Sequence, residues 1–265
     1  MTWQSLAPRW RIRFPLGATA LTILATGALW ELAARLADVS FIPPLGDVLV
    51  RLWQLTFEGE IMDDLLRSLT NLLIGFGISL VFGTAIGVAM GLSKKVEAAL
   101  DIYVYALLTT PTLIFAPVFF AIFGLDPASI IALIVLYAIL YIIINTAAAM
   151  EAAPIELLEM ARSFNTPRRL IFLKIRLPAA LPLILAGYRV AVARAVRGMI
   201  NGEMFIAAVG LGALVIQAGA RFDATTVLAV LILIIIIAYV AIELVSFIDR
   251  RLTGWLPSNE RVGGV

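Results

Sequence analysis

Apolar stretches long enough to cross a lipid bilayer recur along the whole chain, and this pattern constrains the fold more than any other feature. They cover residues 15–36, 69–92, 100–123, 127–149, a run that begins at 178, and 225–248. A helix of roughly 20 apolar residues spans the hydrocarbon layer. Only 14% of the 265 residues are charged and 62% are hydrophobic, which excludes a soluble core. The sequence therefore predicts an all-α polytopic membrane protein with six transmembrane helices.

The positive charges between these segments predict the orientation of the chain. With both termini inside, inner regions carry thirteen lysines and arginines and outer regions carry four, which obeys the positive-inside rule. The inner set is Arg9, Arg11, Arg13, Lys94, Lys95, Arg162, Arg168, Arg169, Lys174, Arg176, Arg250, Arg251 and Arg261; the outer set is Arg35, Arg51, Arg67 and Arg221. We expect cytoplasmic tails over 1–14 and 250–265 and one membrane domain over 15–249, with its main cytoplasmic loop at 150–178.

The first apolar run competes with a cleaved signal peptide as an interpretation. It extends from Pro15 to about Leu36, which is longer than the core of a signal peptide, and no convincing small-residue cleavage site is followed by a soluble domain. We therefore expect it to remain as a membrane helix.

One long polar segment, 151–182, interrupts the apolar pattern and predicts two short helices with a hinge between them. Pro154 suits the first position of the first helix, with Glu156 and Glu159 near its start and Arg162 near its end, the order that the helix dipole favours. Asn165 is expected to end this helix.

The second short helix is expected to start at Thr166 and Pro167, as cap and first position. It carries basic residues until Pro178 and Pro182 open the next apolar segment.

The spacing within this loop resembles a known signature. Glu159-Met160-Ala161, three residues, Asn165, nine residues and then Ile175-Arg176-Leu177-Pro178 is similar to the EAA-xxx-G-x9-I-x-LP motif of inner-membrane permease subunits of binding-protein-dependent ABC importers. Met160 and Asn165 depart from it. Asparagine tolerates the left-handed conformation that a helix end needs, so the second departure preserves the role of the glycine.

Flanking stretches resemble the branch of this family that handles nitrate, sulfonates and taurine. They read PPLGDVLVRLWQL, LLRSLTNLLIGFGISLVFGTAIGVAMGL and GEMFIAAVGLGALVIQAG, and the resemblance covers nearly the whole chain from Trp30 onward. It implies a type I importer permease in a bacterial or archaeal inner membrane, paired with a second permease copy as a homodimer or a close heterodimer. It also implies an ATPase dimer that holds ATP and Mg²⁺ and an external solute-binding protein.

On this resemblance the polar loop is the coupling loop that contacts the ATPase. The helix 154–164 is expected to present either Leu158, Ala161 and Arg162 or its acidic face to a groove. The residues assigned to coupling are Glu156, Glu159, Ala161, Arg162, Asn165, Leu177 and Pro178.

The translocation path is predicted from residues that are costly inside a membrane. Arg189, Arg194 and Arg197 lie within one membrane-length run. Inserting an arginine at the centre of a membrane helix costs roughly 2.5–3.5 kcal/mol of free energy, so these side chains must face protein, water or anions rather than lipid. Glu203 is one candidate partner. Water in a central cavity, carbonyls freed at Pro111 and Pro117, the paired subunit and an anionic solute are the others. Gly198, Gly202, Gly210 and Gly212 are expected to break this helix, which then ends in a short re-entrant or outer helix.

Prolines in the third segment are the second pointer to the path. Thr110 and Pro111, with Pro117 further on, predict a kink whose freed carbonyls need a wet or protein-lined cavity. A kink required only for packing explains the same prolines.

A row of small residues in the second segment predicts close helix packing. Gly75, Ser79, Gly83, Gly87 and Gly91 are each four residues apart and share one helix face. The row itself leaves open whether a helix of this chain or of a second subunit lies against it.

The chain contains no histidine and no cysteine, which removes the commonest general base and metal ligand and every thiol. No G-x4-G-K-[ST] loop occurs either. We therefore expect a non-enzymatic permease without a cofactor, metal or nucleic-acid partner of its own. A secondary transporter or channel and a membrane enzyme are the alternatives, and both lack the intramembrane carboxylates or titratable clusters that they need.

Overall fold

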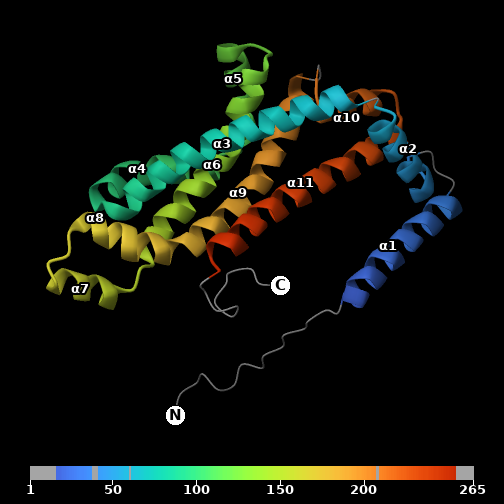
Figure 1. Cartoon of the computed structure of the whole chain (residues 1–265). Helices are drawn as coiled ribbons and strands as arrows, with labels where there is room; N and C mark the ends of the chain where they lie inside the picture. Colours follow the sequence, from blue (N-terminus) through green and yellow to red (C-terminus); the bar gives the residue numbers. More distant parts are fainter. Residues whose placement is uncertain (1–15, 38–40, 60, 207–208, 255–265) are drawn as a thin grey trace.

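The computed structural model describes residues 16–37, 41–59, 61–206 and 209–254, and within these ranges all regular structure is helical (Figure 1). The α-helices are α1 (Leu16–Ala37), α2 (Leu45–Phe57), α3 (Met62–Leu92), α4 (Lys94–Thr109), α5 (Ala116–Phe123), α6 (Pro127–Glu151), α7 (Ile155–Ser163), α8 (Arg168–Ile171), α9 (Leu177–Ile206), α10 (Leu211–Ala220) and α11 (Ala224–Leu252). A 3-10 turn, Thr112–Phe115, and a π-helical turn, Phe172–Arg176, complete them. The all-α prediction is confirmed.

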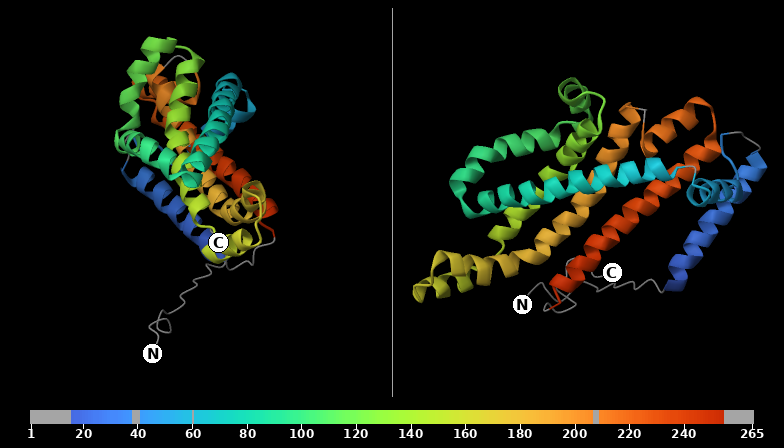
Figure 2. Two further views of the ribbon diagram at one scale, coloured as in Figure 1. Left: turned by 90° about the vertical axis from the view of Figure 1, so that its left-hand side faces the viewer. Right: turned by 45° about the horizontal axis from the view of Figure 1, so that its top comes forward.

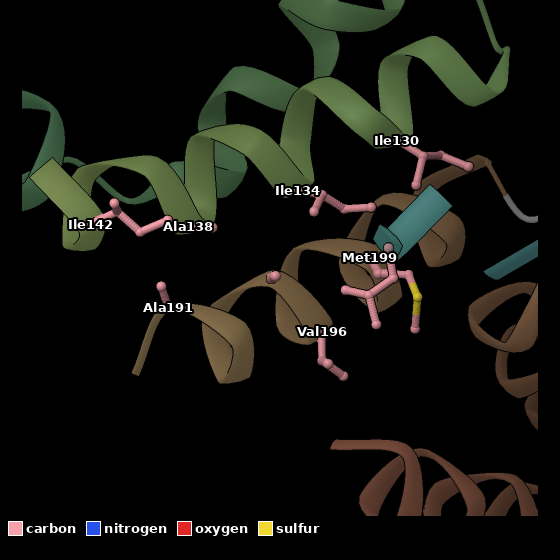
Figure 3. Close-up of a cluster of buried hydrophobic side chains, with 9 residues drawn as sticks. Ile130, Ile134, Ala138, Ile142, Ala191, Val196 and Met199 are labelled. Carbon is pink, nitrogen blue, oxygen red and sulfur yellow. The ribbon is translucent and has the colours of Figure 1, made fainter. Parts of the chain in front are cut away.

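The core of the molecule is α6, which lies between α3 and α9 and has its most extensive contacts with these two helices. Isoleucines along α6 pack against small and medium side chains of α9, as Figure 3 shows for Ile134 and Ile142 with Ala191 and Met199. All four are fully buried. Burying apolar area at about 25 cal/mol per Å² makes this contact a main source of stability for the described helices.

Glycines allow α3 to approach α6 this closely. A Cβ atom built on Gly83 would lie 2.9 Å from a side-chain carbon of Ile142, one on Gly87 2.7 Å from the carbonyl oxygen of Ile143, and one on Gly91 2.6 Å from that of Ala147. The predicted small-residue row is thus a packing face within the chain, so it is not the surface that would join two subunits.

The predicted number of six spans is approximate. Among the described residues, four helices are long and apolar enough to cross a membrane, namely Met62–Leu92, Pro127–Glu151, the continuous run Arg168–Ile206 and Ala224–Leu252, and the bent pair α4 and α5 makes five. The first predicted segment corresponds to α1, a helix of 22 residues.

Several predicted boundaries were wrong. The second segment begins at Met62 and not at about 69, because Asp63 and Asp64 occupy the first turn of α3, where negative charge suits the helix dipole. The third segment is a break rather than a kink: α4 ends at Thr109 and the chain turns by 97° before α5. Pro117 lies in the first turn of α5 and therefore bends nothing.

A second cluster of buried side chains joins α2, α10 and α11. Val48 and Leu55 of α2 pack with Leu211 of α10 and with Val230 and Leu233 of α11. The helix α2 is therefore packed onto the bundle. In Figure 1 and in the right view of Figure 2, α1 stands apart from the other helices, and its principal contact is with α2.

Candidate functional site

The loop between α6 and α9 is the first part of the candidate site, and its hinge has the predicted form. Asn165 adopts a φ of 51°, in the left-handed region. The N–H of Asn165 donates to the carbonyl of Arg162 at 2.9 Å, and the N–H of Thr166 donates to the carbonyl of Ala161 at 3.0 Å. These two bonds form a Schellman motif, which satisfies the last carbonyls of α7. The prediction that asparagine takes over the backbone role of glycine is confirmed.

The start of α7 differs slightly from the prediction. Pro154, with ψ of 126°, is the residue before the helix rather than its first helical residue, and Pro167 has the same place before α8. Both prolines fix φ and lack an N–H that the first turn would leave without a partner.

Of the two faces of α7 that the sequence left open, the structure exposes the acidic one. Leu158 and Ala161 are buried at 9% and 5% exposure, so they support the loop from within. Ile155, Met160 and Phe164 are exposed at 64%, 51% and 78%. The exposed surface therefore combines these apolar side chains, and Leu157 at 43% exposure, with the exposed carboxylates of Glu156 and Glu159. We call Ile155, Met160 and Phe164, with these two glutamates, the α7 face.

The second half of the loop is continuous with the membrane helix. Residues 168–206 form one helical run, so Pro178 and Pro182 do not open a new segment, contrary to the prediction. The π turn 172–176 lies directly before Pro178, and the N–H of Leu177 bonds to the carbonyl of Phe172, five residues back. A π turn is wider than an α turn, and this gives the ring of Pro178 room beside the carbonyl of the preceding turn.

A pocket of about 700 Å³ lies between α7 and this run, and Figure 1 places both at the same end of the molecule. Leu158, Arg162, Asn165 and Arg176 contribute to its lining. The predicted coupling residues thus occupy one region but have two different roles: some line the inside of the loop, whereas Glu156 and Glu159 lie on its outside.

The second part of the site is a pocket of about 300 Å³ in the middle of the bundle. Its lining includes Thr110, Pro111, Arg194 and Arg197, so the structure brings together four of the five residues assigned to the path. We call it the arginine pocket. Arg194 and Arg197 share a face of α9 because they are three residues apart. The guanidinium carbon of Arg194 lies 4.5 Å from the centre of the Tyr141 ring, a cation–π contact.

Glu203, the fifth predicted residue, is elsewhere. It is fully buried, and its Oε2 accepts the N–H of Gly212 at 3.0 Å at the start of α10. Asp64 Oδ1 accepts the N–H of Gly210 at 2.8 Å and Ser68 Oγ accepts the N–H of Leu211 at 3.0 Å. Three successive N–H groups of the α10 N-terminus are therefore bonded by side chains of α3 and α9. Of the candidate partners for the arginines, Glu203 is therefore excluded by its place at α10.

The other glycines near this point do not break α9. The helix continues to Ile206, and Gly198 and Gly202 lie against α6, where a Cβ on Gly198 would be 3.0 Å from Tyr137. Gly210 is the residue directly before α10, and its φ of +89° is a conformation that favours glycine. The predicted short helix is α10, ten residues long.

Arg189 has a partner that the sequence analysis did not find. Its Nη1 lies 3.5 Å from Oδ2 of Asp249 on α11, and both side chains are largely buried. Asp249 lies directly before Arg250 and Arg251 at the basic end of α11. The pairing needs the crossing of α9 and α11, which no local pattern reveals.

Three polar residues of the site region also escaped the sequence analysis, namely Tyr137, Tyr141 and Asn201. Tyr137 and Tyr141 line the arginine pocket from α6, and Asn201 Nδ2 donates to the Tyr137 hydroxyl at 2.9 Å. The available signal was the spacing of the two tyrosines, four residues apart on one face of an otherwise apolar segment.

The chain is similar to known transport proteins. Residues 79–254 match the family described as the binding-protein-dependent transport system inner membrane component. The putative aliphatic sulfonates transport permease SsuC of Bacillus subtilis is 30% identical over 88% of this chain and 85% of its own length. The taurine transport system permease TauC of Escherichia coli is 29% identical over 93% and 92%. The riboflavin transport system permease RibX of Chloroflexus aurantiacus is 28% identical over 92% of each.

A solved structure supports the fold. The inward-facing MetNI methionine ABC transporter contains a chain that superposes with a TM-score of 0.60 at 23% identity, over 71% of this chain and 95% of that one. The family match covers the second part of α3, from residue 79, all of α6 and α9, the polar loop and the arginine pocket. This chain belongs to the family of inner-membrane components of binding-protein-dependent transport systems, and it is a permease of the ABC importer type.

Proposed function

We propose that this chain forms the membrane path of an ATP-driven importer and receives the motion of an ATPase dimer through the α7 face. The observation that carries the proposal is the α7 face itself, which exposes Ile155, Met160 and Phe164 on a short, capped helix at one end of the bundle. An amphipathic helix with exposed apolar anchors suits a groove on another protein. Loss of water from such anchors provides most of the free energy of a contact of this kind.

The proposed assembly contains two permease copies, two ATPase subunits that bind ATP and Mg²⁺, and an external solute-binding protein. The orientation follows from the charge count, with both termini and α7 on the cytoplasmic side of a bacterial or archaeal inner membrane. Hydrolysis would take place on the ATPase subunits and not on this chain.

The proposed solute is a small anion, such as a sulfonate, an organic carboxylate or nitrate. Two of the relatives are named for sulfonate and taurine transport. The arginine pocket supports the same choice, because two arginines line it side by side at mid-length of α9.

The test uses the transporter reconstituted in lipid vesicles with its ATPase and binding protein. Phe164→Asp and Met160→Asp should reduce stimulation of ATP hydrolysis by the loaded binding protein, and should weaken copurification of the ATPase at least about tenfold, as expected for truncation of interface anchors. Ala161→Asp is a poorer test, because a carboxylate at a position with 5% exposure would disturb the loop itself.

Leu125→Asp is the matched control. Leu125 is also exposed, at 68%, but it lies in the turn between α5 and α6 at the opposite end of the molecule from α7 (Figure 1). Full coupling in both α7 variants would refute the proposal, as would equal losses in the control.

A further inference from the structure

The arginine pocket lies near the middle of the membrane-spanning helices. Tyr137 and Tyr141 come from the central turns of α6, and Arg194 and Arg197 lie well inside α9. The remaining wall comes from the break between α4 and α5, where Thr110 and Pro111 interrupt the helix. At about 300 Å³ the pocket reaches the lower limit of typical small-molecule sites.

The charge in this pocket is not balanced by the side chains around it. Among the described residues, neither Arg194 nor Arg197 forms an ion pair with a carboxylate, whereas Arg189 on the same helix is paired with Asp249. Glu203 is committed to the N-terminus of α10. Arg194 is half-buried and Arg197 is exposed in this single chain. Two guanidinium groups without a carboxylate partner, at mid-length of a membrane-spanning helix, favour an anion.

The hydroxyl groups of Thr109 and Thr110 at the break are not available to bind an anion. Thr110 Oγ1 donates to the carbonyl of Ala106 at 2.7 Å, and Thr109 Oγ1 bonds to the carbonyls of Tyr105 and Ala106. The two hydroxyl protons are thus used within α4. The guanidinium groups are therefore the charged donors of the wall, beside the hydroxyls of Thr112, Tyr137 and Tyr141, and their forked geometry matches an oxyanion.

The rest of the wall is apolar or aromatic. Leucines of α4 and α6, including Leu108, Leu136 and Leu140, line the pocket beside the tyrosines. The ring of Tyr141 holds the guanidinium of Arg194 by its face, and Tyr137 is fixed by Asn201. A ligand that fills this space has an oxyanion at one end and a short apolar part at the other.

We propose that the arginine pocket is a binding site in the translocation path for small organic sulfonates or carboxylates, with Arg194 and Arg197 holding the oxyanion and the leucine and tyrosine wall holding the apolar part. The proposal rests on the function proposed above and deepens it. The proposed site would prefer organic anions to nitrate, because nitrate carries the charge but has no apolar part to contact the leucines and tyrosines. Tyr141 acts as a positioning residue for Arg194.

The experiment measures the thermal unfolding midpoint of the purified transporter complex with 1-butanesulfonate, sodium nitrate and the neutral butyl methyl sulfone as probes. The complex contains no solute-binding protein, and its detergent is uncharged. Butanesulfonate should raise the midpoint in a saturable way, nitrate should require at least about tenfold higher concentration, and the sulfone should have no effect. Adding phosphatidylglycerol in place of the sulfonate distinguishes a lipid head group from a solute.

Variants then locate the site. Arg194→Gln and Arg197→Gln should each weaken the dissociation constant for butanesulfonate by about tenfold or more, since each removes a charge-assisted contact. The Lys variants should restore part of the affinity, because a point charge remains without the fork. Tyr141→Leu should weaken binding, and Tyr141→Phe should not, since the ring is kept. Arg67→Gln removes an exposed charge outside the pocket and is the matched control.

Unchanged affinity in the double Gln variant would overturn the proposal, as would equal stabilisation by the sulfone or by phosphatidylglycerol alone. The Lys variants and Tyr141→Phe keep the proposal testable if the Gln variants fail to fold. If the α7 variants lose coupling but the sulfonate binds equally well without the arginines, this site is refuted and the proposed function stands. If sulfonate binding needs the arginines but the α7 variants keep full coupling, the site stands and the proposed coupling through α7 is refuted.

Discussion

Asn165 shows how far a single residue can be predicted. Its backbone role followed from residue type and spacing alone, because left-handed geometry is a local property that asparagine and glycine tolerate. The exposure of its neighbours did not follow in this way. Leu158 and Ala161 belong to one of the two faces that α7 was expected to present, and they are buried against the rest of the loop. Local pattern gives the two faces of a short helix, but only the fold decides which one is covered.

The first prediction concerns the φ of 51° at Asn165. Asn165→Gly should leave transport and loop stability nearly unchanged, because glycine adopts this conformation without strain. Asn165→Val should reduce stimulated ATP hydrolysis and destabilise the loop by roughly 1–3 kcal/mol, since a β-branched side chain resists positive φ. Hydrogen exchange of the Thr166 amide and the ATPase rate measure the two effects. Equal behaviour of the two variants would contradict this account of the hinge.

A second prediction concerns the contact of α3 with α6. Gly87→Leu should lower the thermal unfolding midpoint strongly, because even its Cβ would lie 2.6 Å from Cβ of Thr146. Overpacking of this kind costs typically 1–3 kcal/mol or more. Gly77→Leu on the same helix is the control, since a Cβ there meets nothing within 4 Å. Similar midpoints for the two variants would show that α3 does not approach α6 at Gly87.

At the scale of elements, contiguous apolar segments were predictable and irregular ones were not. Residues 127–149 and 225–248 correspond closely to α6 and α11, because hydrophobicity over a long window dominates there. The break at Thr110 and Pro111 was expected as a kink, since sequence signals the lost hydrogen bond but not the size of the turn. The attachment of α10 was missed because Ser68 and Leu211 are 143 residues apart.

The third prediction tests that attachment. Ser68→Ala should expose the start of α10 to exchange, because the N–H of Leu211 loses its acceptor in a buried position, a loss of roughly 1–3 kcal/mol. Hydrogen exchange over 209–214 by mass spectrometry measures the opening. Thr70→Ala is the control, because the Thr70 hydroxyl bonds only within α3, to the carbonyl of Leu66. Protection that survives Ser68→Ala would show that the serine does not hold α10.

The fourth prediction concerns the start of α11. The side-chain and backbone hydrogen bonds from Thr226 lower the pKa of Asp223, which caps this helix. Its contribution is therefore complete above the ordinary pKa of an aspartate, about 4, and is lost as pH falls through the lower folded value. Asp223→Asn keeps the acceptor oxygen without titrating. Exchange at Thr226 should become faster in acid, after correction for the intrinsic rate, in the wild type but not in this variant; a parallel response would exclude the cap.

At the scale of the whole molecule, composition predicted the class and the charge count predicted an orientation. The absence of cysteine makes this orientation simple to test. Ser163→Cys on α7 should react with a membrane-impermeant maleimide only in inverted vesicles, and Leu125→Cys only in intact cells or right-side-out vesicles. Both positions are exposed, so protection reports the side of the membrane. The opposite pattern would invert the chain and remove α7 from the reach of a cytoplasmic ATPase.

The close approach of α3, α6 and α9 also has a mechanical consequence. Three helices whose backbones nearly touch at glycines cannot slide past one another by small side-chain adjustments, so they behave as one lever. The loop with α7 connects the inner ends of α6 and α9, so a push on this loop would tilt all three together. The chain yields more easily at the Thr110–Pro111 break, where helical hydrogen bonding is already interrupted. This break borders the pocket of Arg194 and Arg197, so a tilt of α6 and α9 relative to α4 would change the width of that pocket.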